Sequence, residues 1–336
     1  MTDWKSKATP GQATISDFRF DDGRRLDVTL GYQTLGSLDA SAGNAVMLLH
    51  GTTGSGQQFL EPSIANFLFD LGQPLDASRF FVILPDAIGH GGSSRPSDGL
   101  GPDFPQYGYI DIVEGQYRLL TQGLGIERVR LLLGTSMGGM QTWLWGERYP
   151  DAAQALMPIA SLPERITGRN LLWRRMLIDL IRSDPGYAGG RYDQQPAGLG
   201  HAMALFQMMA GSTRQMASDL PTIDAADTRV TTTEAHALTG DDANDVVWEF
   251  EASRDYDPAP DLQAIQAPLL AVNFSDDELN PVELGGLERA ISQVPRGQAR
   301  TLPAGPKSRG HQTLHVAETW RQHVAELLTL TETAPA

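Results

Sequence analysis

The chain has 336 residues, of which 41% are hydrophobic and 20% charged, a composition typical of a folded globular protein. Its formal net charge is −15 at pH 7, and no basic stripe offsets this charge, so a nucleic-acid-binding surface is disfavoured. Cysteine is absent, which excludes disulfides, thiolate metal sites and a cysteine nucleophile.

The first residues, 1–7, lack the apolar core of a signal peptide. No apolar run approaches the ~18 residues that a membrane-spanning helix requires. We therefore expect a cytoplasmic protein with no membrane partner. A chain from which a leader had been removed would have the same sequence pattern.

Segments typical of strands and helices alternate from the start of the chain to about residue 160. Apolar runs at 46–50 and 80–84 predict buried strands, and 128–133, which ends in three leucines, predicts another. The helix expected between the first two strands has an apolar face made of Leu60, Ile64, Phe67, Leu68 and Leu71. The helix expected before the third has one made of Val113, Tyr117, Leu120 and Leu124. This alternation predicts an α/β fold with a mostly parallel central sheet and helices on both faces.

The segment 161–260 shows helical patterns and loops but no core strand. One predicted helix has an apolar face made of Leu172, Met176, Leu177, Leu180 and Ile181, and another contains Met203, Phe206, Met208 and Met209. Alternation resumes with a predicted strand at 268–274 and ends in a helix that contains Val316, Trp320, Val324 and Leu327. We therefore predict a core domain formed by residues 1–160 and 261–336. Residues 161–260 would form an inserted helical cap, which has the size of a small domain.

The five residues 134–138 read Gly-Thr-Ser-Met-Gly and stand between a predicted strand and a helical pattern at 139–145. Strand, Gly-x-Ser-x-Gly and helix in this order form the nucleophile elbow of α/β-hydrolases. Glycines allow the sharp turn on which the Ser136 hydroxyl is presented above the sheet. The alternative is a glycine-rich turn that joins strand to helix without a chemical role.

A serine nucleophile needs a base, and the base needs a group that orients it. In α/β-hydrolases the three follow in the order Ser, acid, His. His311 directly precedes the last predicted helix and is the expected base. Asp276 and Asp277 both follow the strand at 268–274; we prefer Asp277 because it stands four residues before Pro281, which we expect to open the next helix at its first position. Asp276 would then cap a helix or face water.

The site also needs N–H donors for the developing oxyanion. The backbone N–H groups of Met137, directly after the serine, and of Thr52, in the loop 50–56, are the candidates. This loop has the glycine spacing of a phosphate-binding loop, but Gln57 occupies the lysine position, so nucleotide binding is disfavoured. His311 and His315 have the spacing of a zinc-binding helix without its glutamate. We therefore expect neither a cofactor nor a metal.

Beyond this motif, the chain resembles the homoserine O-acetyltransferase branch of the α/β-hydrolase superfamily. The similarity covers roughly residues 28–325 and rests on segments 32–40, 136–141, 183–192, 242–244, 255–257, 279–281 and 310–311. It implies that Ser136, Asp277 and His311 form the catalytic triad. It also implies that the cap forms a tunnel and a homodimer contact.

Two departures from this branch bear on the substrate. The acetyltransferases have an arginine six residues before the Asp-Pro of the cap, where this chain has Ile178. They also have an aspartate after the catalytic histidine, where this chain has Gln312. An amino acid substrate would lose both charged anchors and leave its own charges desolvated without partners. The loop 86–93 also resembles that of an ordinary hydrolase, so homoserine is not the expected substrate.

These observations favour a serine hydrolase that cleaves a small or medium neutral carboxylic ester through an acyl-enzyme. An alternative is an O-acyltransferase that uses a small acceptor other than homoserine. A third hypothesis is a non-catalytic protein that retains the fold and the triad for ligand recognition.

Overall fold

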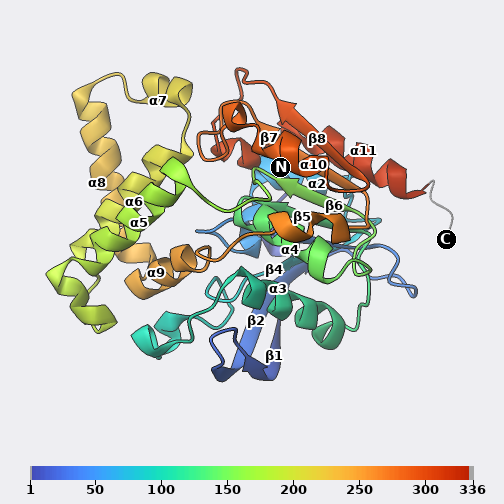
Figure 1. Ribbon diagram of the computed structural model, residues 1–336, viewed down its shortest axis with the longest axis horizontal. Helices are drawn as coiled ribbons and strands as arrows, with labels where there is room; N and C mark the ends of the chain where they lie inside the picture. Colours follow the sequence, from blue (N-terminus) through green and yellow to red (C-terminus); the bar gives the residue numbers. More distant parts are fainter. Residues whose placement is uncertain (1, 333–336) are drawn as a thin grey trace.

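The computed structural model describes residues 2–332, and within them one sheet of eight strands in the order β1-β2-β4-β3-β5-β6-β7-β8 (Figure 1). The strands are β1 (Thr9–Arg19), β2 (Arg25–Leu35), β3 (Ala45–Leu49), β4 (Phe81–Pro85), β5 (Leu131–Thr135), β6 (Leu156–Ile159), β7 (Leu269–Phe274) and β8 (Gly297–Leu302). The pairs β1–β2 and β2–β4 are antiparallel, and all the others are parallel. The predicted α/β-hydrolase fold with a mostly parallel sheet is confirmed.

Both faces of the sheet are covered by helices. The helices are α1 (Trp4–Lys7), α2 (Pro62–Leu68), α3 (Tyr109–Arg118), α4 (Met137–Arg148), α5 (Gly168–Arg182), α6 (Ala197–Ala210), α7 (Thr213–Asp219), α8 (Ile223–Gly240), α9 (Ala243–Glu251), α10 (Gly286–Ile291) and α11 (Arg321–Glu332). Residues of β3 alternate between two hydrophobic clusters, Val46 and Leu48 in one and Met47 and Leu49 in the other. The first cluster includes α2 and α11, and the second includes α3 and α4. The alternation follows from the period of two along a strand and places a core on each side of the sheet.

Between β6 and β7 the described chain contains α5 to α9 and no strand. Figure 1 shows α5, α6, α7 and α8, coloured green to yellow-orange, grouped at one end of the molecule and apart from the strands. The division into a core and a cap at residues 160 and 261 stays a prediction. No helix within residues 2–332 is long and apolar enough to cross a lipid bilayer.

The helix faces differ in part from the expected ones. Leu71 lies beyond the end of α2 and is 87% exposed. In α5, Leu172 and Met176 are exposed, and the buried face instead consists of Trp173, Arg174, Leu177, Ile178 and Ile181. The buried face of α5 is therefore rotated by about one residue, and it takes a charged side chain inside.

Candidate active site

The turn at Ser136 is held by close backbone packing. Ser136 has φ 54° and ψ −114° between β5 and the first residue of α4. A Cβ atom at Gly134 would stand 2.0 Å from the Gly138 carbonyl oxygen, and one at Gly138 would stand 2.0 Å from the Leu49 carbonyl oxygen. Neither position accepts a side chain, so strand β3, the turn and α4 fit together only with glycines there. Ser136 itself is half-buried at the end of the sheet.

The structure brings Ser136, His311 and Asp277 together from three segments of the chain. The Ser136 hydroxyl donates to His311 Nε2 at 2.7 Å, and His311 Nδ1–H donates to Asp277 Oδ2 at 2.7 Å. This tautomer is assigned from the hydrogen-bond network. The two donor–acceptor pairs form one continuous path from a hydroxyl to a buried carboxylate, which is the arrangement that activates a serine.

Asp277 is held by donors from its own loop. The Leu279 N–H donates to Asp277 Oδ1 at 2.9 Å, and Asn280 Nδ2 donates to Asp277 Oδ2 at 2.8 Å. Burial opposes ionisation of Asp277, but the His311 ring and these donors outweigh it, so the pKa of this carboxyl lies below its ordinary value. Asp277 is therefore ionised at neutral pH.

Asn280, for which the sequence pattern predicts no role, contacts several parts of the site. Its Nδ2 also donates to the Ala160 carbonyl oxygen at 3.0 Å and stands 3.5 Å from His311 Nδ1. The sequence offers only the closeness of Asn280 to Asp277, three residues earlier in the loop after β7, as a sign of these contacts.

Asp276 does something other than expected. Its Oδ2 accepts a hydrogen bond from the Gly310 N–H at 3.1 Å, and the residue is half-buried. It neither caps a helix nor simply faces water, because it binds the backbone of the residue directly before His311. The expected role of Pro281 is also wrong: it precedes a short 3₁₀ turn, Val282–Leu284, and α10 begins only at Gly286.

The loop that contains Thr52 is anchored next to the serine. Gln58 accepts from the Gly51 N–H at 3.0 Å and donates to Thr135 Oγ1 at 2.8 Å. His90 Nε2 lies 2.7 Å from the Thr52 carbonyl oxygen. The N–H groups of Thr52 and Met137 have no acceptor among the described residues, so both are available to a ligand, although their role as oxyanion donors stays a prediction.

Three other histidines near these elements are neutral. Burial lowers the pKa of His50 to about 4, that of His90 to about 3 and that of His315 to about 4. None of these three makes a hydrogen bond to Ser136, whereas His311 lies between Ser136 and Asp277.

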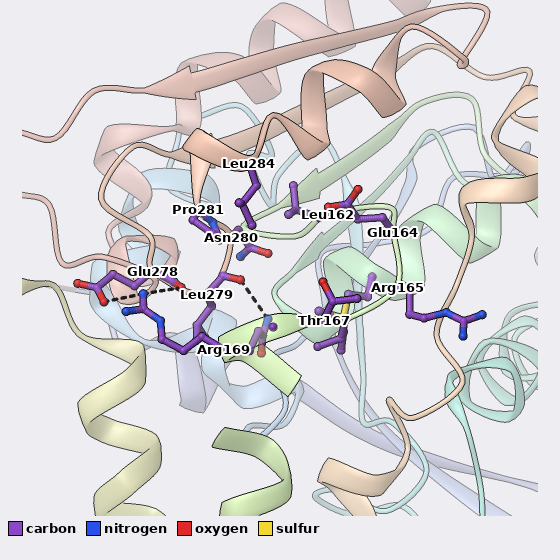
Figure 2. A pocket seen from close by; sticks show the side chains of 14 residues that line it. Leu162, Glu164, Arg165, Thr167, Arg169, Glu278, Leu279, Asn280, Pro281 and Leu284 are labelled. Atoms are coloured by element: carbon purple, nitrogen blue, oxygen red, sulfur yellow. Dashed lines mark hydrogen bonds and ion pairs between the residues drawn. The ribbon is translucent and has the colours of Figure 1, made fainter. Parts of the chain in front are cut away.

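Figure 2 shows a pocket between the loop after β6 and the loop after β7. Asn280 and Met140 are on its wall, and the ion pair of Arg169 with Glu278, at 2.8 Å, lies at one side. Neither Ser136 nor His311 is among its lining residues. The pocket therefore adjoins the residues that follow Asp277, and it does not include Ser136 or His311.

Residues 44–293 match the sequence model of the α/β hydrolase fold family. A probable acyltransferase of Methanothermobacter thermautotrophicus is 29% identical over 82% of this chain and 85% of its own length. A homoserine O-acetyltransferase of Chlorobaculum parvum is 34% identical over 61% of this chain, and the match spans 58% of that enzyme.

Solved structures of both activity classes share the fold. The acetyl esterase MekB superposes with a TM-score of 0.84 at 24% identity, covering 97% of this chain and 98% of that one. A homoserine O-acetyltransferase from Bacillus anthracis also reaches 0.84, at 19% identity and with coverage of 96% and 97%. The chain belongs to the α/β-hydrolase family, and homoserine O-acetyltransferases are among its relatives.

Proposed function

We propose that the protein is a serine hydrolase that cleaves a small or medium carboxylic ester through an acyl-enzyme. The observation that carries this proposal is the continuous hydrogen-bonded path from the Ser136 hydroxyl through His311 to Asp277. Such a path lets the imidazole accept a proton while the carboxylate stabilises the imidazolium that forms.

In the first half-reaction Ser136 Oγ attacks the ester carbonyl carbon while its proton passes to His311 Nε2. The oxygen that becomes negative is placed to accept from the N–H groups of Thr52 and Met137. The C–O bond to the alcohol then breaks, and His311 returns the proton to the leaving alkoxide. In the second half-reaction a water molecule loses a proton to His311 and attacks the acyl carbon. The C–O bond to Ser136 then breaks, and His311 returns the proton to Ser136 Oγ as the acid leaves.

A second candidate is an acyltransferase in which a small alcohol replaces water in the second half-reaction. The names of the acyltransferase relatives favour it, and the first half-reaction is identical. Ile178 and Gln312 stand where the branch places charged residues, which supports an acceptor other than homoserine.

Pre-steady-state hydrolysis of p-nitrophenyl acetate tests the nucleophile. We expect a burst of p-nitrophenol equal to the enzyme concentration, and its loss in Ser136→Ala with a decrease in kcat of at least about 10³-fold. A Ser136→Ala variant that keeps the burst would contradict the proposal. Absence of any turnover by the wild type would favour the non-catalytic ligand-binding alternative.

Product partitioning separates hydrolysis from transfer. The acetyl-enzyme is formed from p-nitrophenyl acetate in the presence of a panel of small alcohols that includes homoserine, and the acetylated products are quantified by mass spectrometry. A hydrolase yields acetate at a rate that the alcohols leave unchanged. An alcohol that diverts most of the acetyl group at millimolar concentration would establish the transferase instead.

A further inference from the structure

Arg174 in α5 is a buried cation without an acid. Its side chain is 5% exposed, and no carboxylate forms an ion pair with it within the side chains described, residues 2–331. Its partners are neutral groups: Nε donates to Asn170 Oδ1 at 3.0 Å, and Nη1 donates to Ser253 Oγ at 3.2 Å. The guanidinium also lies over the rings of Trp173 and Phe250, 5.1 and 5.6 Å from their centroids. Buried charges are normally paired, because an isolated ion loses much more hydration energy than neutral partners return.

Other arginines of the same helix have acids. Arg175 and Arg182 both form ion pairs of 2.8 Å with Glu251, and their side chains are about half exposed. Glu251, the last residue of α9, thus pairs with two arginines of α5 that water also solvates. Arg174, which is shielded from water, receives no carboxylate.

Tyr109, the first residue of α3, is a second buried group whose hydrogen bonding is incomplete. It is 2% exposed, and its hydroxyl has polar neighbours but no well-aligned hydrogen bond. The side chains that face this hydroxyl are those of Arg174, Ser253 and Thr52. Burial raises the pKa of the Tyr109 phenol and the Arg174 guanidinium opposes that effect, so the hydroxyl keeps its proton and can donate it. A buried donor of this kind normally has an acceptor.

These groups adjoin the proposed reacting centre. Thr52 follows Gly51, and a Cβ atom at Gly51 would stand 3.6 Å from the Ser136 Cβ atom. The order in space is therefore Ser136, the loop of Thr52, Tyr109 and Arg174. A ligand that reached the Tyr109 hydroxyl would extend from the same loop that is expected to hold the oxyanion.

We propose that Arg174, Tyr109 and Ser253 form a carboxylate-binding subsite, so that the substrate is a short ester that also bears a carboxylate. A carboxylate accepts from the guanidinium and from both hydroxyls, and it supplies the counter-charge that Arg174 lacks. The inference rests on the proposed ester hydrolysis and replaces the expectation of a neutral substrate. Asn170 continues to orient the guanidinium by accepting from Nε.

Matched pairs of esters test this subsite. In the acyl arm, p-nitrophenyl hemisuccinate is compared with its methyl ester, and in the alcohol arm O-acetyl-lactate is compared with methyl O-acetyl-lactate. The readout is the ratio of kcat/KM for the charged ester to that for the neutral one. We expect a ratio of about 10 or more in one arm, and that arm identifies which part of the substrate carries the carboxylate.

The variant Arg174→Met should lower this ratio by about 10- to 100-fold, the range for a lost hydrogen bond to a charged group. Arg174→Lys should lower it less, because it keeps the charge but loses the planar donors. Arg175→Met is the matched control: it removes the neighbouring arginine on the exposed side of α5 and should leave the ratio unchanged.

A folding defect in Arg174→Met is detected by its thermal unfolding curve. In that case Tyr109→Phe and Ser253→Ala are used in place of Arg174→Met, because both keep the Arg174 cation. Each should lower the ratio of kcat/KM for the charged ester to that for the neutral one by about 3- to 10-fold. A wild-type ratio of one or less in both arms overturns the subsite. Variants that lower kcat/KM equally for the charged and the neutral ester also overturn the subsite, since a purely structural role of these residues would have that effect.

Binding of succinate and of acetate to Ser136→Ala, measured by calorimetry, separates the two proposals. If the wild type hydrolyses no ester but succinate still binds, and Arg174→Met abolishes that binding, the subsite is supported and the proposed function is wrong. If esters are hydrolysed without any preference for a carboxylate, the proposed function is supported and the subsite is wrong.

Discussion

Asp277 and Asp276 are adjacent carboxylates with different partners, His311 for the first and the Gly310 N–H for the second. We expect Asp277→Asn to lower kcat by about 10³- to 10⁴-fold, because the amide no longer holds the imidazole in the tautomer that accepts the serine proton. Asp276→Asn keeps an acceptor for Gly310 and should lower kcat by less than about 10-fold. Steady-state kinetics with p-nitrophenyl acetate measures both. A larger decrease for Asp276→Asn than for Asp277→Asn would identify Asp276 as the catalytic acid instead.

Asn280 is a positioning residue, since it touches Asp277, the Ala160 carbonyl oxygen and the neighbourhood of His311 Nδ1. Asn280→Ala removes a donor that helps to keep the pKa of Asp277 low. We expect a decrease in kcat of about 10-fold, from the loss of one hydrogen bond to a charged group. The acidic limb of the pH–rate profile should also move to higher pH, because Asp277 takes up its proton more readily. An unchanged profile with a lower kcat would indicate a purely structural role.

At the scale of elements, α9 is attached to the loop before α3 through Asp245. Its carboxylate accepts from the Ser97 N–H at 2.8 Å and the Ser97 hydroxyl at 2.6 Å, and Arg95 Nε lies 3.7 Å away. Burial raises the pKa of Asp245 to about 6, and the Ser97 donors and Arg95 only partly oppose it. Glu249, one turn further along α9, is buried, and its pKa is raised in the same direction.

The sign of the pH effect follows from this shift. The pKa of Asp245 is higher in the folded protein than the ~3.9 of an unfolded aspartate, so the folded state binds more protons. The stability from this group is present below about pH 4 and is lost as the pH rises to about 6. Asp245→Asn keeps the contacts with Ser97 and should be more stable than the wild type at pH 8, by up to about 3 kcal/mol.

Urea unfolding at pH 4 and pH 8 measures this difference, which should nearly vanish at pH 4. Asp255→Asn is the control, because Asp255 lies on the exposed surface just after α9 and should leave the pH dependence unchanged. A variant less stable than the wild type at pH 8 would mean that the ion pair with Arg95 outweighs burial.

The strands that could be predicted from the sequence are the fully buried ones. All residues of β3, β5 and β7 are buried, so each contains a run of apolar residues that stands out in the sequence. The outer strands β1 and β8 have mostly exposed or half-exposed residues and give no such run. The four-residue strand β6 contains Pro158 and is too short to stand out.

The site residues that could be predicted are those with a marker in the neighbouring sequence, and the residues that were missed have no such marker. Ser136, Asp277 and His311 each have a local marker, namely a strand end, a glycine turn or the start of a helix. Arg174 has none, because a helical pattern assigns charged residues to water and aliphatic residues to the core. In α5 the exposed Leu172 reverses that rule. The carboxylate subsite depends on such a reversal, and only the packed structure reveals it.

At the scale of the whole molecule, the subsite would join two parts of the chain. Tyr109 comes from the segment before β5, whereas Arg174 and Ser253 come from the segment between β6 and β7. If residues 161–260 form a cap, as the sequence predicts, a bound carboxylate would contact residues of the cap and of the core at the same time. Ligand binding would then stabilise the interface between them as well as the site.

The predicted homodimer through the cap has a surface that fits it. Leu172 and Met176 stand one turn apart on α5 with 61% and 47% of their areas exposed, and Ile223 at the start of α8 is 79% exposed. Neighbouring exposed apolar side chains, such as those of Leu172 and Met176, are typical of protein contacts. We expect a dimer in light scattering after size-exclusion chromatography, and a monomer for the double variant Leu172→Glu with Met176→Glu.

Leu71→Glu is the matched control for the dimer. Leu71 is 87% exposed but lies outside the predicted cap, so this variant should remain dimeric. A wild-type protein that is monomeric at all concentrations would contradict the predicted contact, and a Leu71→Glu monomer would place the interface elsewhere.

The packing around the elbow affects how its motif is interpreted in related chains. Gly134 and Gly138 are fixed by the contacts among β3, the turn and α4, and these contacts do not involve the hydroxyl of Ser136. A descendant that lost the nucleophile would still need both glycines in order to fold. The glycines of the pattern therefore diagnose ancestry and architecture. Enzymatic competence in such a descendant would be diagnosed by a serine, a histidine and an aspartate at the positions of Ser136, His311 and Asp277.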